Sequence, residues 1–210
     1  MKTRKVPVPV YAVAFLLAIS ALFPMYWMIA TSLRKTSSLY AAGAFVLEQP
    51  ILDNYVKLVT MRDGIYFRWY WNTLLVALSV TAAVLVVSAL GGYTFSKLVF
   101  PGREAIFTTI LATLMIPYIV SVIPLFLMFR GLNLIDTYAG LIFPGIVSVG
   151  AVPMFWMRQY ISTLPKELES AALVDGCSEL GVFTRIVFPL CKPALAVAGI
   201  YTFWQQWISF

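Results

Sequence analysis

Histidine is absent from this sequence, and cysteine and charged residues are scarce. With no histidine among the 210 residues, imidazole-based catalysis and most transition-metal sites are excluded. The two cysteines, Cys177 and Cys191, are too few and too far apart for a zinc site, and neither belongs to a CxxC redox pair. We therefore expect two inert, small apolar thiols in a reducing compartment, and no bound metal.

The scarcity of charge points to a membrane protein. Charged residues make up 11% of the chain and hydrophobic residues 61%, with a mean hydropathy of +0.88. A soluble domain of this size cannot hide so much apolar surface from water. The net charge is +6, but the basic residues are scattered among apolar runs, which favours orientation in lipid over nucleic-acid binding. The sequence thus predicts an all-α integral membrane protein that binds no nucleic acid.

Five uncharged runs alternate with charged loops. A spanning helix needs about 20 apolar residues, so the runs predict spans at about 8–31, 70–96, 105–129, 137–158 and 193–210 of a single membrane domain, 1–210. The first run follows a basic N-terminus, but it exceeds the roughly 7 to 15 apolar residues of a secretory signal and lacks a cleavage site. We therefore expect it to be retained as a helix.

Basic residues in the loops predict the orientation. With the N-terminus in the cytoplasm, nine basic residues lie inside: Lys2, Arg4, Lys5, Lys97, Arg103, Arg158, Lys166, Arg185 and Lys192. Six lie outside: Arg34, Lys35, Lys57, Arg62, Arg68 and Arg130. This modest bias agrees with the positive-inside rule. The long outer loop, 34–68, has the Gly, Pro, Asp and Asn content of turns and at most one short helix.

The predicted spans contain no Asp, Glu, Lys or Arg apart from Arg158 at the end of the fourth. Carriers driven by protons or sodium often place such a group in the membrane, so its absence favours energy supplied by another protein. The third and fourth spans contain four prolines: Pro117, Pro124, Pro144 and Pro153. Proline removes a backbone hydrogen bond, so we expect kinks that suit a cavity, although membrane helices also tolerate proline for no functional reason.

The last run contains the sequence TFWQQWISF. Two adjacent glutamines well inside a membrane helix are costly against lipid, so at least one is expected to face other helices or water. Aromatic faces together with amide groups suit a sugar path, for which the candidates are Trp204, Gln205, Gln206 and Trp207. The alternative is interhelical hydrogen bonding combined with an aromatic belt.

A charged loop, 162–190, contains the sequence ELESAALVDG. Ser162 or Thr163 is expected to cap a helix with Pro165 in its first turn, and Gly176 to end it. A second short helix is expected to begin near Ser178. One face of the first helix combines Leu164, Leu168, Ala171 and Ala172. Such a shallow stripe can dock into a groove of a partner protein, or it can lie on the chain's own membrane domain.

This loop resembles the signature loop of permease subunits in binding-protein-dependent ABC importers, which reads EAA, three residues, G, nine residues, I, any residue, L, P. The residues in register are Ala171, Ala172, Gly176, Ile186 and Pro189. Ser170 stands where glutamate is usual, and Phe188 where leucine is usual. Glu169 lies one residue before the usual glutamate position.

Other segments resemble the maltose-type branch of these sugar permeases. They are LFPMYWMIATSLR, WNTLLVA, YTFSKLVFPGR, IPYIVSVIPLF, LIDTYAGLIFP and FWQQW, which together cover essentially the whole chain. The resemblance implies the type I ABC importer permease fold. Five of the usual six core helices are then present, the fifth ending at the chain terminus, so that the chain is expected to be a C-terminally truncated subunit.

The resemblance also implies a function and partners. Such a subunit lies in the bacterial inner membrane and forms half of the pathway for a sugar or sugar-like solute delivered by an extracytoplasmic solute-binding protein. Its partners would be a second permease subunit and a cytoplasmic ATPase dimer. No GxxxxGK[ST] phosphate loop occurs here, so the ATPase would bind ATP, and the chain itself would be neither an enzyme nor a cofactor protein. A permease for amino acids is the alternative.

By the same resemblance, the loop is the element that couples the permease to the ATPase. The coupling residues it implies are Glu167, Leu168, Glu169, Ala171, Ala172, Asp175, Gly176, Ile186 and Pro189.

Overall fold

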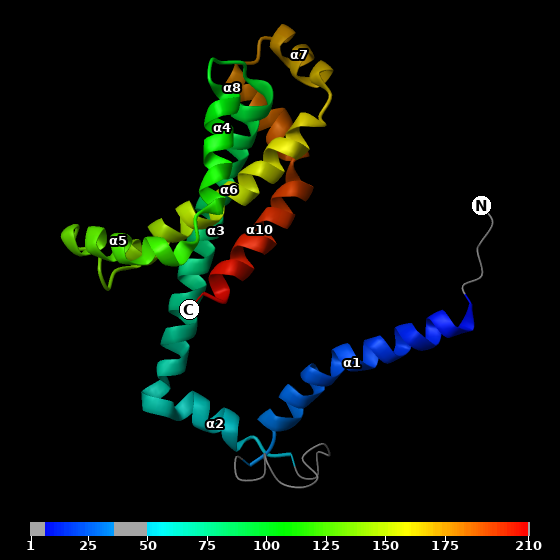
Figure 1. Cartoon of the computed structure of the whole chain (residues 1–210), viewed down its shortest axis with the longest axis vertical. Helices are drawn as coiled ribbons and strands as arrows, with labels where there is room; N and C mark the ends of the chain where they lie inside the picture. Colours follow the sequence, from blue (N-terminus) through cyan, green and yellow to red (C-terminus); the bar gives the residue numbers. More distant parts are fainter. Residues whose placement is uncertain (1–6, 36–49, 210) are drawn as a thin grey trace. The chain divides into compact units, whose positions relative to one another are not determined.

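The computed structural model describes residues 7–35 and 50–209, and all regular structure in these ranges is helical (Figure 1). The basic residues Lys2, Arg4 and Lys5, the middle of the long loop and the terminal Phe210 lie outside the described residues. The chain divides into two compact units, Met1–Tyr70 and Trp71–Phe210.

The first unit contains α1 (Val8–Ser32), which coincides with the first uncharged run. After the long loop come α2 (Asp53–Thr60) and one turn of 3₁₀ helix, η2 (Met61–Gly64). The side-chain amide of Asn54 donates to the carbonyl oxygens of Ser32 at 2.9 Å and Arg34 at 2.6 Å. These bonds satisfy carbonyls at the end of α1 and attach α2 to it.

The second unit is built around α3 (Ile65–Lys97), α6 (Tyr138–Ser162) and α10 (Lys192–Trp207), of which α3 begins in the first unit. At Gly92 the backbones of α3 and α6 come so close that an added Cβ would lie 2.6 Å from Met157 Cβ. Farther along, the buried side chains Val76, Val80 and Val84 pack against α6. Small residues thus allow the close helix packing typical of membrane proteins.

The third uncharged run is broken into two helices. It forms α4 (Arg103–Ala112) with a 3₁₀ turn, η3 (Thr113–Met115), and then α5 (Tyr118–Gly131), bent by 98° relative to the first part. Pro117 lies at the break, where Ile116 before it has extended backbone, as proline requires of its neighbour. The kink expected at Pro117 is confirmed, whereas α5 and α6 continue through the other three prolines.

Among the described residues, three helical segments are long and apolar enough to cross a membrane: Pro9–Ser32, Asp53–Lys97 and Tyr138–Ser162. The number rises to five if each bent helix pair counts as one span. The second bent pair joins the loop helices α8 (Glu179–Val182), η4 (Phe183–Val187, a π-helix) and α9 (Phe188–Leu190) to α10, at an angle of 74°.

Candidate functional site

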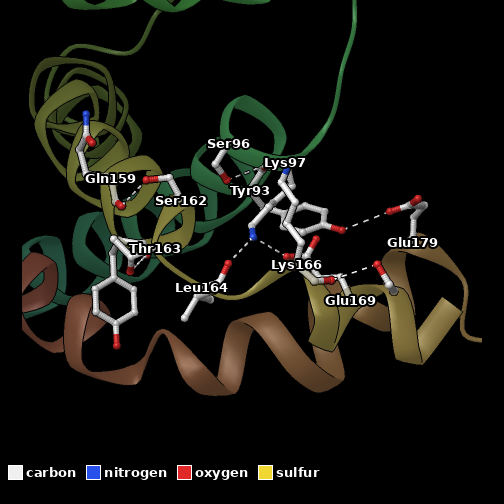
Figure 2. A network of polar contacts seen from close by, with 12 residues as sticks. Tyr93, Ser96, Lys97, Gln159, Ser162, Thr163, Leu164, Lys166, Glu169 and Glu179 are labelled. Carbon is white, nitrogen blue, oxygen red and sulfur yellow. Dashed lines mark hydrogen bonds and ion pairs between the residues drawn. The ribbon is translucent and has the colours of Figure 1, made fainter.

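The charged loop begins with a short helix, α7 (Lys166–Val174). Pro165 occupies its N-cap position, and no side chain caps it. The hydroxyls of Ser162 and Thr163 instead donate to carbonyl oxygens in the last turn of α6, both at 2.7 Å (Figure 2). The expected cap by Ser162 or Thr163 is therefore wrong, because both side chains are used to finish the preceding helix.

Gly176 ends α7 as expected. Its φ is +83°, a left-handed conformation that glycine adopts without steric cost. The Gly176 amide donates to Leu173 O at 3.1 Å, and the Cys177 amide donates to Ala172 O at 2.9 Å. This pair of bonds is the Schellman arrangement, which satisfies the last carbonyls of a helix. The chain can therefore turn sharply from α7 into α8.

The two faces of α7 have different surroundings. Ala172, only 5% exposed, belongs to a core cluster with residues of α3, α6 and the later loop helices, and Leu164 packs against that cluster. Leu168, Ala171 and Val174 are exposed. The predicted stripe is therefore divided: part of it lies on the chain's own membrane domain, and part is open to a partner.

A buried ion pair fixes the inner face of α7 to the end of α3 (Figure 2). Lys97 Nζ lies 2.6 Å from Glu169 Oε1, and the two side chains are only 6% and 15% exposed. Lys97 Nζ also donates to Leu164 O at 2.9 Å, just before α7 begins. Glu169 Oε1 has no well-aligned hydrogen-bond partner in the described part of the chain, so this charge contact compensates its burial.

The same end of α3 also holds α8. The Tyr93 hydroxyl lies 3.2 Å from Glu179 Oε2 and donates to it, and the Tyr93 ring packs on Phe183 with centroids 5.2 Å apart (Figure 2). Ser178 caps α8 by accepting from the Gly181 amide at 3.2 Å, as expected for a helix that begins near Ser178. One turn of α3 therefore contacts both helices of the loop.

The positions where the loop departs from the family pattern have contrasting surroundings. Ser170 is exposed, and its hydroxyl donates to the carbonyl of Lys166 within α7, at 3.1 Å. Glu169 turns inward to Lys97 and does not occupy the exposed position of Ser170. Phe188 packs on Phe183, with centroids 5.9 Å apart.

The remaining predicted loop residues are spread over several surroundings. Glu167 and Asp175 are exposed on α7 and at its end, Ile186 packs against the core cluster, and Pro189 is exposed in α9.

Lys97, Tyr93 and Glu179 belong to this site but were not predicted from the sequence to do so. From the sequence, Lys97 was used only as one of the basic residues that predict the orientation of the chain in the membrane. The signal that could have found it is its position, because a lysine directly after a long apolar helix lies where a loop carboxylate can reach it. Tyr93 gave no such signal, since tyrosines are frequent throughout this chain.

The residues on α10 that were predicted to line a sugar path lie on two different faces. Gln205 and Gln206 line a cavity of about 390 Å³ between α6 and α10, together with Tyr118 from the start of α5. Trp204 and Trp207 instead line a separate apolar hollow with Leu78 of α3. The expectation that at least one glutamine faces other helices is confirmed, since Gln206 is only 6% exposed.

Comparisons with known proteins agree on one family. Residues 85–210 match the family described as "Binding-protein-dependent transport system inner membrane component". Over 198 residues the chain is 38% identical to the arabinooligosaccharides transport system permease protein AraQ of Bacillus subtilis (strain 168), an alignment that covers 93% of this chain and 69% of AraQ. Over 201 residues it is 31% identical to the sulfoquinovosyl glycerol transport system permease protein SmoH of Agrobacterium fabrum, covering 95% of this chain and 70% of SmoH.

A solved structure has the same fold. The chain matches a crystal structure of a bacterial ABC transporter involved in the import of the acidic polysaccharide alginate, with a TM-score of 0.82 and 24% identity. The match covers 99% of this chain and 75% of that chain.

Proposed function

The chain belongs to the family of binding-protein-dependent transport system inner membrane components, and from this premise we propose that it forms half of the solute pathway of an ATP-driven sugar importer. Both the family and the all-α permease fold were predicted from the sequence, and both predictions are confirmed. A second permease subunit would supply the other half of the pathway, a solute-binding protein would deliver the solute, and a cytoplasmic ATPase dimer would bind and hydrolyse ATP.

The names of the relatives support a sugar as the solute. AraQ is named for arabinooligosaccharides and SmoH for sulfoquinovosyl glycerol, and both solutes contain sugar rings. Among the described residues, those that line the cavity between α6 and α10 include amide and hydroxyl groups and no charged side chain. An amino acid, which carries two opposite charges, has no ionic partner there. These observations favour the sugar over the amino-acid alternative.

The arrangement of α7 is the observation that carries the coupling role. Its inner face is fixed to α3 by the Lys97–Glu169 ion pair, while Leu168 and Val174 are exposed. A helix that is rigidly attached on one side and open on the other can bind an ATPase subunit and move together with α3. In this proposal α7 lies on the cytoplasmic side, as does the N-terminus.

The coupling role can be tested on the outer face of α7. We expect Val174→Glu to lower solute uptake and ATPase co-purification by roughly tenfold or more, because a charge would be buried at the interface. Val99→Glu is the matched control, since Val99 is 92% exposed, Val174 is 88% exposed, and Val99 lies outside the loop. If Val174→Glu retains both uptake and co-purification, α7 is not the docking helix.

The solute class can be tested independently with the purified complex in proteoliposomes. We expect ATP-dependent uptake of a labelled sugar from a panel of arabinotriose, lactose, maltose and trehalose. Uptake of labelled amino acids, with none of these sugars, would contradict the proposed solute class.

A further inference from the structure

Gln206 is a largely buried residue whose carboxamide lines a cavity. The residue is 6% exposed, and its carboxamide makes no hydrogen bond within residues 7–35 and 50–209. The carboxamide atoms are nevertheless not fully enclosed, since in those ranges Glu169 Oε1 is the fully enclosed side-chain atom that lacks a partner. An amide that the chain leaves unpaired but open to a cavity can bond there to water or to a bound molecule. The side chain lines the cavity of about 390 Å³ between α6 and α10, where a bound molecule can supply the missing partner.

Gly145 of α6 leaves the space that the carboxamide occupies. A Cβ added at Gly145 would lie 3.0 Å from Gln206 Oε1 and 2.9 Å from a methyl group of Val80. A Cβ at position 145 would therefore force the Val80 methyl group and the Gln206 carboxamide to shift. The backbone of α6 and the core of α3 therefore fix this polar group at the edge of the cavity.

The rest of the cavity lining is polar but uncharged. Tyr118, Ser148, Gln205 and Ser209 contribute hydroxyl and amide groups, and Leu141, Pro144 and Val149 contribute apolar surface. The Ser148 hydroxyl makes one long bond, of 3.4 Å, to the carbonyl of Gly145, and Ser209 donates to the backbone carbonyl of Gln206 at 2.8 Å. The Tyr118 hydroxyl makes no hydrogen bond within the described residues. Donors and acceptors thus remain available beside Gln206.

The cavity also adjoins a larger one. Tyr118, Pro144 and Ser148 line both it and a cavity of about 670 Å³ between α5 and α6, to which Thr113 and Ser121 add hydroxyls. Both volumes fall within the range of small-molecule sites, about 300–1,000 Å³. A ligand that extends from Gln206 past Ser148 can therefore be longer than one ring.

We propose that Gln206, with Ser148 and Tyr118, forms a subsite that binds neighbouring hydroxyl groups of a neutral sugar on its way through this subunit. A carboxamide offers a donor and an acceptor side by side, which matches two adjacent hydroxyls. An anionic solute would need a cation, and the described residues that line the cavity include none. This inference rests on the proposed function and adds the residues that contact the solute.

The first test measures transport in the complete importer, with its binding protein, in proteoliposomes. We expect Gln206→Leu to lower arabinotriose uptake by about fivefold to tenfold, the effect of losing a hydrogen bond to the solute. Thr202→Val is the matched control, because Thr202 is a buried polar residue of the same helix whose hydroxyl already bonds to Ala198 O at 2.8 Å. The control should transport as the unaltered protein does.

The second test detects binding directly. Ser148→Cys, in a chain with both native cysteines replaced by serine, is treated with a charged thiosulfonate reagent in the presence of millimolar arabinotriose. We expect the sugar to slow modification of the thiol in the Ser148→Cys variant about fivefold. The sugar should give no such protection when Gln206→Leu is also present. Thr81→Cys, on the other face of the bundle, should not be protected.

The outcomes separate the subsite from the proposed function. If the unaltered importer takes up none of the sugars in the panel, the proposed function fails and the subsite fails with it. If it transports sugar and Gln206→Leu transports equally well, the subsite alone is overturned. If Gln206→Leu abolishes co-purification of the second permease subunit, Gln206 bonds to that subunit, and the subsite is likewise overturned.

Discussion

At the scale of single residues, Lys97 and Glu169 are the most tightly constrained charges in the loop site. Both side chains are largely removed from water and lie 2.6 Å apart. Moving the two charges out of water costs several kcal/mol each, and their mutual attraction roughly offsets that cost. The pair therefore adds little net stability, but losing one partner leaves an uncompensated buried charge.

We expect Lys97→Met to lower the free energy of unfolding by about 3–5 kcal/mol, because Glu169 is left buried and unpaired. Adding Glu169→Leu should restore most of that loss, since two apolar side chains of similar volume can replace a buried pair at little cost. Thermal unfolding of the two single variants and the double variant in detergent measures this coupling. If the stability losses of the two single variants simply add in the double variant, the ion pair is contradicted.

Replacing Gln206 should have the opposite effect on stability from replacing Lys97. The Gln206 carboxamide has no hydrogen-bond partner among the described residues, and the residue is only 6% exposed, so leucine suits this position at least as well as glutamine. In the purified chain without solute, Gln206→Leu should therefore raise the unfolding temperature or leave it unchanged. A clear decrease would mean that the carboxamide has a structural partner. Heating the protein in detergent with a fluorescent thiol probe gives this measurement.

At the scale of helices, the approach of α3 and α6 depends on Gly92. We expect Gly92→Ala to destabilise the second unit by about 1–3 kcal/mol, because the new methyl group would meet Met157 Cβ at 2.6 Å and the Arg158 amide nitrogen at 2.9 Å. Gly150→Ala is the control on α6, where an added Cβ would have no atom within 4 Å. The control should be neutral or stabilising by up to about 1 kcal/mol, since alanine favours helix.

The end of α7 depends on the left-handed backbone of Gly176. Gly176→Ala meets no side-chain obstruction, so its cost is that of the backbone conformation, about 1–2 kcal/mol. We expect Gly176→Asn to cost less, because asparagine tolerates this conformation better. Hydrogen exchange of the Cys177 amide, which closes the Schellman arrangement, should speed up more in the alanine variant than in the asparagine variant.

The helices were more predictable than the contacts between them. Uncharged runs located α1, α3, α6 and α10 because spanning helices have a length and a composition that are visible in a sequence. The sequence showed four prolines at which a helix could bend, but not that the 98° bend would lie at Pro117. Which proline breaks a helix depends on the packing of the surrounding helices, which the sequence does not show.

In the loop site, too, local features were predictable from the sequence and contacts between distant residues were not. Gly176 could be read as a stop because one residue determines that turn. Lys97 and Glu169 could not be paired, since they are far apart in the chain and only the packing of α3 beside the loop brings them together. Likewise, the sequence placed Trp204 beside the glutamines, and the helix turned them to different faces.

At the scale of the whole molecule, the two cysteines report on the exposed loop and on the core. Cys177 is partly exposed between α7 and α8, and Cys191 is 1% exposed in the core cluster. We expect a maleimide to label Cys177 in the folded chain and to spare Cys191 until unfolding. An attached ATPase should slow the labelling of Cys177. Mass spectrometry of the Cys177→Ser and Cys191→Ser variants assigns each site, and rapid labelling of Cys191 in the native protein would contradict the packing.

The depth of the Lys97–Glu169 contact has a consequence for the conditions under which α7 remains attached. Dissolved ions screen exposed charges strongly and buried ones weakly. The contact between Arg158 and Glu104, whose carboxylate side chain is 60% exposed, should therefore loosen as a cell concentrates potassium under osmotic stress. The Lys97–Glu169 contact should not loosen, because both side chains are buried. The attachment of α7 to α3 should therefore be equally strong whether the cell shrinks or swells.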